Sequence, residues 1–212
     1  MKVDLEKVKT FTNDLSEEAY KSFSAGNLLS VDCEMMGLNP YRDRLCLVQM
    51  CGEDNSIVLV KFENKDLKGL APNLKALFEN DKVTKIFHFA RTDLTFLKLY
   101  LDIEVKNVFC TKNASRLTRT FTDKHSLKDI VKDLFNINLD KASQSSDWGQ
   151  DDLTRDQIKY AASDVIYLIP IYKKLSEVLK REGRIDLLND ANKFLPTLAK
   201  LDLMGYTDFF AH

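Results

Sequence analysis

Two acidic residues separated by one position follow a short apolar run near the start of the chain. Asp32 and Glu34 come directly after the apolar residues around Val31, and Gly37 signals a turn just beyond them. In a strand, residues i and i+2 point to the same face, so the two carboxylates should project side by side. Carboxylates held this close repel each other unless a proton or a cation lies between them. The spacing favours an all-oxygen site for Mg²⁺ or Mn²⁺, with an edge strand bearing two solvated acids as the alternative.

Two further acids lie on segments that we expect to be helical. Asp93 comes just past an expected strand, in the first turn of a helix, where a lone carboxylate is often only a partner of the helix dipole. Tyr160 and Asp164 are four positions apart, which places them one above the other on one helical face. The small Ala161 and Ala162 between them would let that face approach a sheet closely. Alone, Tyr160 is typical of a core aromatic residue, whereas acids on three segments together indicate one site.

The elements that must position these residues are predicted by the hydrophobic periodicity. Strands are expected over 28–33, 45–50, 56–61, 84–88 and 105–109, and helices over 15–23, 67–78 and 90–101. Residues 52–55 predict a hairpin, so the first three strands should form an antiparallel meander, and residues 12–14 are expected to cap the first helix. From Thr111 onward the pattern is almost wholly helical. This order predicts an α/β fold with a mixed β-sheet, flanking helices and a helical C-terminal part.

Composition limits the class of protein. The chain has 212 residues, 44% hydrophobic and 30% charged, as expected for one soluble domain with a substantial core. We expect no membrane span and no signal peptide, because no apolar run is long enough. The 4 cysteines lack zinc spacing and disulfide density, which predicts reduced thiols in a cytoplasmic protein. A net charge of -1 argues against a broadly basic nucleic-acid grip, but not against a small nucleic-acid substrate.

The acidic segments resemble the motifs of DEDD-type 3′→5′ exonucleases, in the tyrosine-bearing branch that includes ribonuclease D. Asp32 and Glu34 match the first motif, Asp93 the second, and Tyr160 with Asp164 the third. Lys141, Gln144, Ser146, Asp147 and Trp148 resemble a further ribonuclease D stretch, and residues 42–46, 110–112, 115–120, 145–149, 194–197 and 210–212 are similar to the short bacterial nanoRNase C type. The resemblance implies a ribonuclease H-like exonuclease fold. It also implies one exonuclease domain over 1–212, without the C-terminal helical RNA-binding domains of full-size ribonuclease D.

One position departs from the family pattern. The family usually has Asp-Thr-Glu-Thr where this chain has Asp32-Cys33-Glu34-Met35. We expect Cys33 to point to the other face of the sheet, where a small apolar group fits. Met35 replaces a hydroxyl near the substrate backbone, but it removes no metal ligand.

The resemblance also implies the roles of the site residues. Asp32, Glu34, Asp93 and Asp164 would hold two divalent metal ions, Mg²⁺ or Mn²⁺, with Asp32 bridging them. Tyr160, as a phenol with an ordinary pKa near 10, is a poor base and should instead orient the attacking water.

Five residues are predicted to contact substrate: Leu38, His88, Gln144, Ser146 and Trp148. Leu38 could wedge against the terminal base, as in oligoribonucleases, or be a core leucine. His88 could reach the sugar or a phosphate, or be a satisfied buried histidine. Gln144 and Ser146 belong to a polar loop that could bind the backbone, and Trp148 could pack that loop in place.

The remaining basic and apolar residues leave alternatives open. Lys112, Arg116 and Arg119 share a helix, where phosphate contact competes with a solvated face or an intersubunit contact. Residues 187–198 form an apolar helical stripe that Pro196 should kink, and aromatic residues crowd the C-terminus. Resemblance to nanoRNase C implies a ring-shaped octamer, so we expect 184–212 to take part in assembly.

The sequence favours a metal-dependent 3′→5′ exoribonuclease that hydrolyses short RNA down to dinucleotides and releases nucleoside 5′-monophosphates. A broader exonuclease that trims RNA precursors or DNA ends is the second interpretation. The third is a catalytically silent binding module on the same fold. Metal titration separates the third interpretation from the others, because a binding module need not take up two divalent ions.

Overall fold

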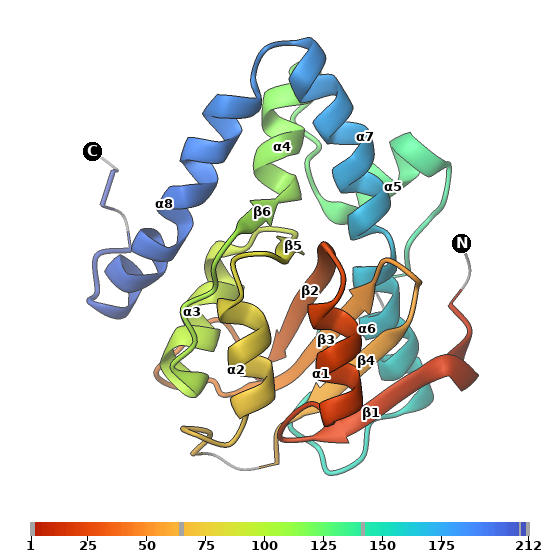
Figure 1. Cartoon of the computed structure of the whole chain (residues 1–212), viewed down its shortest axis with the longest axis vertical. Coiled ribbons are helices and arrows are strands. Elements are labelled where there is room, and N and C mark those ends of the chain that lie inside the picture. The colour runs from red at the N-terminus through yellow and green to blue at the C-terminus, as the bar shows by residue number, and fades with distance from the viewer. Residues whose placement is uncertain (1–2, 64–65, 141–142, 208, 211–212) are drawn as a thin grey trace.

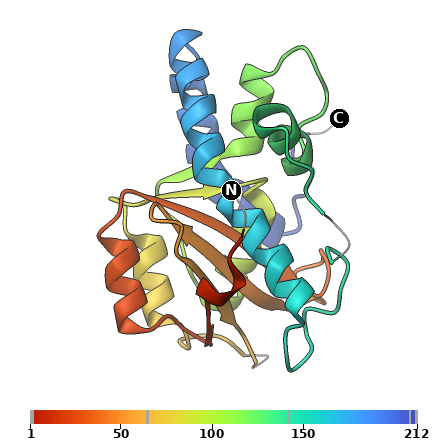
Figure 2. The ribbon, with the colours of Figure 1, turned by 90° about the vertical axis from the view of Figure 1, so that its right-hand side faces the viewer.

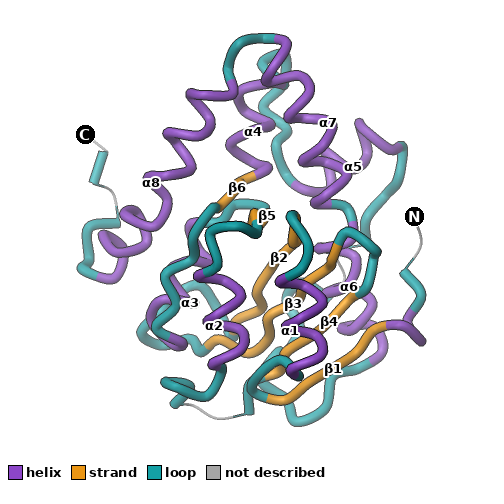
Figure 3. The backbone as a smooth tube through the Cα atoms, viewed as in Figure 1, coloured by secondary structure: helices purple, strands orange, loops and turns teal. Residues whose placement is uncertain are grey.

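A six-stranded mixed sheet forms the centre of the described chain (Figures 1 and 3). The structure, a computed structural model, describes residues 3–63, 66–140, 143–207 and 209–210. After the 3₁₀-helix η1 (Leu5–Lys7), the strands are β1 (Val8–Thr12), β2 (Leu28–Met35), β3 (Leu45–Gly52), β4 (Ile57–Lys61), β5 (Thr84–Phe87) and β6 (Val108–Cys110), in the spatial order β1-β4-β3-β2-β5-β6. Strands β2, β3 and β4 are antiparallel, whereas β5 and β6 continue from β2 in parallel. The predicted meander, hairpin and mixed sheet are therefore confirmed.

Helices cover both faces of this sheet (Figure 2). Helices α1 (Glu17–Ser24), α2 (Pro72–Glu79) and α3 (Arg91–Leu101) pack on one face, and α6 (Arg155–Ile166) packs on the other. Helices α4 (Thr111–Thr118), α5 (Leu127–Phe135), α7 (Leu168–Arg181) and α8 (Ile185–Leu203) build the helical C-terminal part seen at the top of Figure 1. No helix in the described part of the chain is both long and apolar enough to cross a membrane.

Strand β2 alternates between two hydrophobic cores. Leu29, Val31 and Cys33 belong to the core beneath α1, α2 and α3, as the period-2 pattern predicts. Asp32 and Glu34 therefore face the opposite side, toward α6. All 4 cysteines of the chain are free and buried.

The first strand and the helix caps differ from the prediction. Strand β1, which pairs in parallel with β4, was not predicted because it is a short edge strand with no buried residue. Ser16 caps α1 through its side chain, so the expected capping by residues 12–14 is wrong. Asp14 instead accepts hydrogen bonds of 2.9 Å from the backbone amides of Asn73 and Leu74 and so caps α2.

Two prolines define the helices around them. Pro72 occupies the first position of α2, where its missing N–H is not needed, so the helix begins there rather than at residue 67. Pro196 lies inside α8, which continues through it as one helix, and the expected kink stays a prediction. The expected apolar stripe of α8 is buried only in part: Leu188 and Leu195 are buried, whereas Leu187, Ala191 and Phe194 are exposed.

Candidate active site

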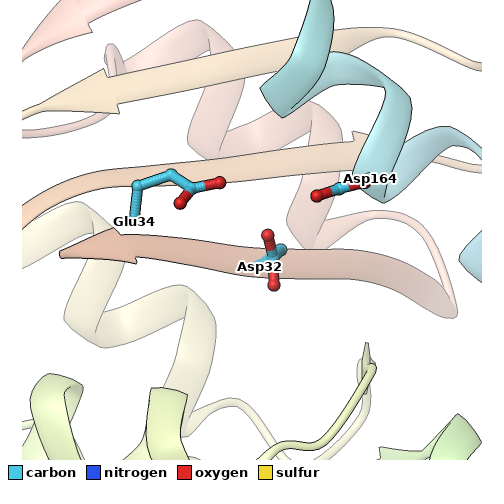
Figure 4. Close-up of side chains that lie close together, drawn as sticks. All are labelled: Asp32, Glu34 and Asp164. Atoms are coloured by element: carbon cyan, nitrogen blue, oxygen red, sulfur yellow. The ribbon is translucent and has the colours of Figure 1, made fainter. Parts of the chain in front are cut away.

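Three carboxylates meet where the end of β2 faces α6. Asp32, Glu34 and Asp164 each contribute one oxygen to a group whose members lie within 4.8 Å of one another (Figure 4). Ala161 and Ala162 are fully buried, and their small side chains let α6 lie close to β2 and β3. The i, i+2 spacing on β2 thus places Asp32 and Glu34 on one face, and α6 brings Asp164 to that face from far along the chain.

Asp93 reaches the same pocket from the other side of the sheet. It lies in the first turn of α3, directly after β5, and its side chain is buried. The backbone amide and the thiol of Cys33 both hydrogen-bond to the Asp93 carboxylate. Cys33 itself points to the other face of the sheet, as expected, and belongs to the core beneath α3. Its hydrogen bonds lower the pKa of Asp93 and so offset part of the effect of burial.

The four carboxylates repel one another in a poorly solvated site. Burial, followed by the charges of Asp93, Glu34 and Asp164, raises the pKa of Asp32 well above its usual range. Burial and the charge of Asp164 raise the pKa of Glu34 to about 9, and burial raises that of Asp93 to about 7. A divalent cation would take the place of the protons that this cluster otherwise needs. The oxygen-only donor set fits Mg²⁺ or Mn²⁺.

Gln49 holds two of these acids in place. It lies opposite Asp32 on β3, and its fully buried side-chain Nε2 donates to Asp32 Oδ2 at 2.7 Å and to Glu34 Oε1 at 3.2 Å. Sequence reasoning missed this residue. The available signal was a single amide at an inward position of an otherwise apolar strand.

Tyr160 is a hydrogen-bond donor rather than a base. Its hydroxyl hydrogen-bonds to the Asp164 carboxylate, one helical turn along α6. Burial, followed by the charge of Asp164, raises the pKa of Tyr160 above its usual value, so the phenol stays protonated at neutral pH. The ring packs against buried Trp148, with 5.9 Å between the ring centroids.

The five residues predicted to contact substrate line the same pocket as the acids: Leu38, His88, Gln144, Ser146 and Trp148. The Leu38 side chain is 79% exposed, so the alternative of a core leucine is wrong. His88 is half-buried, with its Nδ1 2.9 Å from Thr111 Oγ1. Met35 also lines the pocket and packs partly against the core beneath α3.

Comparisons with known proteins decide the family. A family model described as 3'-5' exonuclease matches residues 8–180. The chain belongs to this 3′-5′ exonuclease family. Ribonuclease D of Acidiphilium cryptum is 38% identical over 164 residues, and that of Gluconacetobacter diazotrophicus is 34% identical over 175 residues. These matches cover 77% and 79% of this chain, which spans only 41% and 44% of the two relatives' length.

Solved structures give the same assignment. Brucella melitensis NrnC is 42% identical, with a TM-score of 0.90 over 97% of this chain and 98% of that chain. The same protein bound to pGG matches with a TM-score of 0.88, and with bound Mg²⁺ the TM-score is 0.89. Escherichia coli RNase D, 20% identical with a TM-score of 0.76 over 90% of this chain and 50% of that chain, shares the fold. The resemblance to ribonuclease D and nanoRNase C is therefore confirmed, and so is the ribonuclease H-like exonuclease fold.

The polar loop that carries Gln144 and Ser146 is tied to the helix that carries Tyr160. Gln157, in the capping box of α6, donates from Nε2 to Ser146 Oγ at 3.1 Å and to the Asp147 carbonyl at 2.9 Å. These bonds fix the loop relative to α6. Lys141, Ala211 and His212, which contribute to the family resemblance, lie outside the described residues.

The segment that carries Leu38 depends on a glycine. The Asp43 carboxylate accepts the Asn39 amide at 3.0 Å and pairs with Arg42. A Cβ on Gly37 would overlap this carboxylate. Glycine is therefore required at this position, because only it lets the chain pass so close to Asp43.

Proposed function

We propose that this chain is a metal-dependent 3′→5′ exoribonuclease that hydrolyses short oligoribonucleotides, down to dinucleotides, and releases nucleoside 5′-monophosphates. The observation that carries the proposal is the cluster of Asp32, Glu34, Asp93 and Asp164 beside Tyr160 in one open pocket. Similarity to NrnC bound to pGG, at 42% identity, supports a short substrate.

The four carboxylates would hold two divalent ions, Mg²⁺ or Mn²⁺. Similarity to NrnC with bound Mg²⁺ supports this assignment. When bound, such a pair lowers the pKa of the attacking water and neutralises charge that develops at the scissile phosphate. Asp32 is the best placed to be shared between the ions, because its carboxylate interacts with those of Asp93, Glu34 and Asp164.

The chain's own groups orient the reactants. The neutral Tyr160 hydroxyl, held beside Asp164, orients the attacking water by hydrogen bonding. Leu38 wedges against the terminal base, and His88 contacts the sugar or a phosphate. Gln144 and Ser146 bind the substrate backbone from the polar loop. Trp148, which is buried, acts by holding the Tyr160 ring.

The test follows 5′-labelled RNA dinucleotide and a longer single-stranded RNA, each in Mg²⁺ and in Mn²⁺. Asp164→Ala is the control for metal-dependent cleavage. Rapid dinucleotide cleavage with slow attack on the longer RNA supports the proposal. Processive shortening of the longer RNA that stalls at dinucleotides would instead support a broader exonuclease acting on RNA or DNA ends, an alternative favoured by the ribonuclease D relatives. No cleavage in either metal would favour a silent binding module.

We also propose that the protein is a cytoplasmic homo-oligomer, an octameric ring, in which residues 184–212 contribute to assembly. Exposed aromatic side chains gather beyond α8, where the Phe210 ring lies 5.7 Å from that of Phe194 and 5.1 Å from that of Phe209. Exposed apolar clusters of this kind mark association surfaces. If deletion of residues 205–212 left the light-scattering mass of the particle at the octamer value, this part of the proposal would fail.

A further inference from the structure

The segment that carries Leu38 has no strand or helix of its own. Residues 36–44, here called the Leu38 loop, join β2 to β3 through bends and turns only, and the Leu38 side chain is exposed. Burial therefore does not fix this side chain at the pocket. A group on such a loop is held precisely only when neighbouring elements support it. The contacts between the Leu38 loop and its neighbours thus determine where Leu38 lies.

One contact of the Leu38 loop is with α3. The hydroxyl of Tyr100 lies 3.0 Å from the carbonyl oxygen of Pro40 and 3.2 Å from that of Asp43, and it donates to both. The Tyr100 ring stacks on that of Phe96, a buried residue of the core beneath α3, with 5.9 Å between the ring centroids. The loop is therefore fixed to the helix that carries Asp93.

A second contact of the Leu38 loop is with the end of α8. The hydroxyl of Tyr41 donates to the carbonyl oxygen of Leu203, in the last turn of α8. The last carbonyls of a helix have no partner within it. The backbone amide of Tyr206 satisfies the carbonyl of Leu201 at 2.9 Å, and the Tyr41 hydroxyl satisfies that of Leu203. The Tyr41 side chain is 65% exposed, so its hydroxyl, and not burial of its ring, links the loop to α8.

The end of α8 is in turn fixed to α3. The guanidinium of Arg91, in the first turn of α3, donates from Nε and Nη2 to the two carboxylate oxygens of Asp202, at 2.7 and 2.5 Å. Gly205, with a φ of 87°, lets the chain reverse after α8, and Arg91 Nη2 also donates to the carbonyl oxygen of Thr207 at 2.5 Å. Because bidentate pairs fix orientation as well as distance, the end of α8 has a defined position relative to α3.

These contacts form a closed frame of three elements. Tyr100 joins the Leu38 loop to α3, an ion pair joins α3 to α8, and Tyr41 joins α8 back to the loop. Leu38 lines the active-site pocket, whereas no described residue of α8 does. The end of α8 therefore lies outside the site but is connected to it through the loop.

We propose that the end of α8 is a positioning element for the Leu38 loop and that Tyr41 is the residue through which it acts. The Tyr41 hydroxyl holds the loop in the position in which Leu38 contacts the terminal base of the substrate. Displacing a substrate-positioning group by about 1 Å can cost about a hundredfold in rate. This inference rests on the proposed exoribonuclease function and adds to it two positioning residues, Tyr41 and Asp202.

The first test is a double-mutant cycle with an RNA dinucleotide as substrate. We expect Tyr41→Phe, which removes only the hydroxyl, to lower kcat/KM about tenfold, the effect of losing one hydrogen bond. In the Leu38→Ala background the same substitution should change kcat/KM less than about twofold, because residues that act through one another are not additive. Tyr20→Phe, on α1, is the matched control. Equal effects in both backgrounds, or no effect in the wild type, would overturn the proposal.

The second test concerns α8 itself. Asp202→Asn keeps the shape of the side chain but removes the charge that pairs with Arg91. We expect kcat/KM to fall about fivefold in the wild type and to stay nearly constant in Tyr41→Phe, with unchanged Mg²⁺ affinity by calorimetry. Glu17→Gln, which removes an exposed ion pair on α1, is the control. A loss of Mg²⁺ affinity, or an equal effect in both backgrounds, would show that Asp202 acts through α3 and would overturn the route through Tyr41.

Hydrogen exchange separates this inference from the proposed function. In EDTA and without substrate, mass spectrometry measures exchange of the Leu38 loop amides, of which those of Asn39 and Asp43 are hydrogen-bonded within the loop. We expect faster exchange in Tyr41→Phe and Asp202→Asn than in the wild type, and unchanged exchange in β3.

The two proposals then fail in different ways. If the wild type cleaves no RNA but exchange in the Leu38 loop depends on the Tyr41 hydroxyl, the exoribonuclease proposal fails and the link between α8 and the loop stands. If the wild type cleaves the dinucleotide but neither exchange nor kcat/KM depends on that hydroxyl, the positioning role alone fails.

Discussion

The side-chain amide of Gln49 donates a 2.7 Å hydrogen bond to the carboxylate of Asp32 across the β2–β3 pair. The same amide reaches Glu34 at 3.2 Å. A buried donor between two acids offsets part of their repulsion and fixes their orientation toward α6. Gln49 therefore positions two of the proposed metal ligands without being a proposed ligand itself.

Gln49→Leu should weaken metal binding. The substitution preserves the approximate volume but leaves two buried carboxylates without their shared donor. We expect a 10- to 100-fold loss of Mg²⁺ or Mn²⁺ affinity, roughly the effect of removing a hydrogen-bond partner of metal ligands. Isothermal titration calorimetry measures the loss. Unchanged affinity would show that the strand alone orients the acids.

Tyr160→Phe should lower turnover far more than metal affinity. The variant keeps the ring packed on Trp148 but loses the hydroxyl beside Asp164. We expect kcat to fall roughly a hundredfold, as for the loss of a group that orients a proton-transferring reactant. Calorimetric metal titration is the second readout. Equal losses in kcat and metal affinity would contradict the assigned role, and Tyr172→Phe, on α7 against Phe109, is the control.

Stability without metal should fall as the pH rises. The folded-state pKa values of Glu34, about 9, and Asp93, about 7, lie above their ordinary values of 4.5 and 3.8. Between those limits the folded protein binds more protons than the unfolded chain, so the free energy of unfolding decreases with increasing pH. The contribution of protonation is fully present below about pH 4 and is lost through pH 7 to 9.

Thermal unfolding in EDTA and in saturating Mg²⁺ measures this effect. We expect Tm in EDTA to decline from pH 5 to pH 8.5, and the decline to be much smaller with Mg²⁺, because a bound cation replaces the protons. Glu34→Gln should flatten the EDTA profile. Parallel profiles with and without metal would contradict the expectation.

Gly37→Ala should impair substrate use without affecting metal binding. Its Cβ would overlap the Asp43 carboxylate and displace the segment that presents Leu38. We expect kcat/KM on dinucleotides to fall about tenfold, a loss of about 1.4 kcal/mol in transition-state binding. Gly26→Ala, whose Cβ would meet no atom closer than 3.5 Å, is the matched control. A normal kcat/KM in Gly37→Ala would show that the segment adapts.

The acids of the site could be predicted because local rules govern them. The period of a strand pairs Asp32 with Glu34, and the period of a helix pairs Tyr160 with Asp164. That these pairs meet at one point, together with Asp93, depends on contacts between distant elements, which spacing alone does not determine. The family resemblance supplied that step, and the structure brings all five to one pocket.

Other features could not be predicted from local patterns. In the sequence, Gln49 is one polar residue in an apolar strand, and its role depends on the pairing of β3 with β2, which places it opposite Asp32. Phe89 has a φ of 67°, in the left-handed region, which sequence patterns predict for glycine or asparagine and not for phenylalanine. Lys112 contacts that ring only because β5 and β6 lie side by side. Strand β1 was missed because a half-exposed edge strand carries little hydrophobic pattern.

The carboxylates also belong to different parts of the molecule. Asp93 lies on α3, whose apolar side chains pack into one core, whereas Asp164 lies on α6, whose apolar side chains pack into the other. Asp32 lies on the strand between them. A cation coordinated by all three would act as a non-covalent staple through the sheet. It would link the two cores into one cooperative unfolding unit, so chelation should broaden the unfolding transition as well as lower its midpoint.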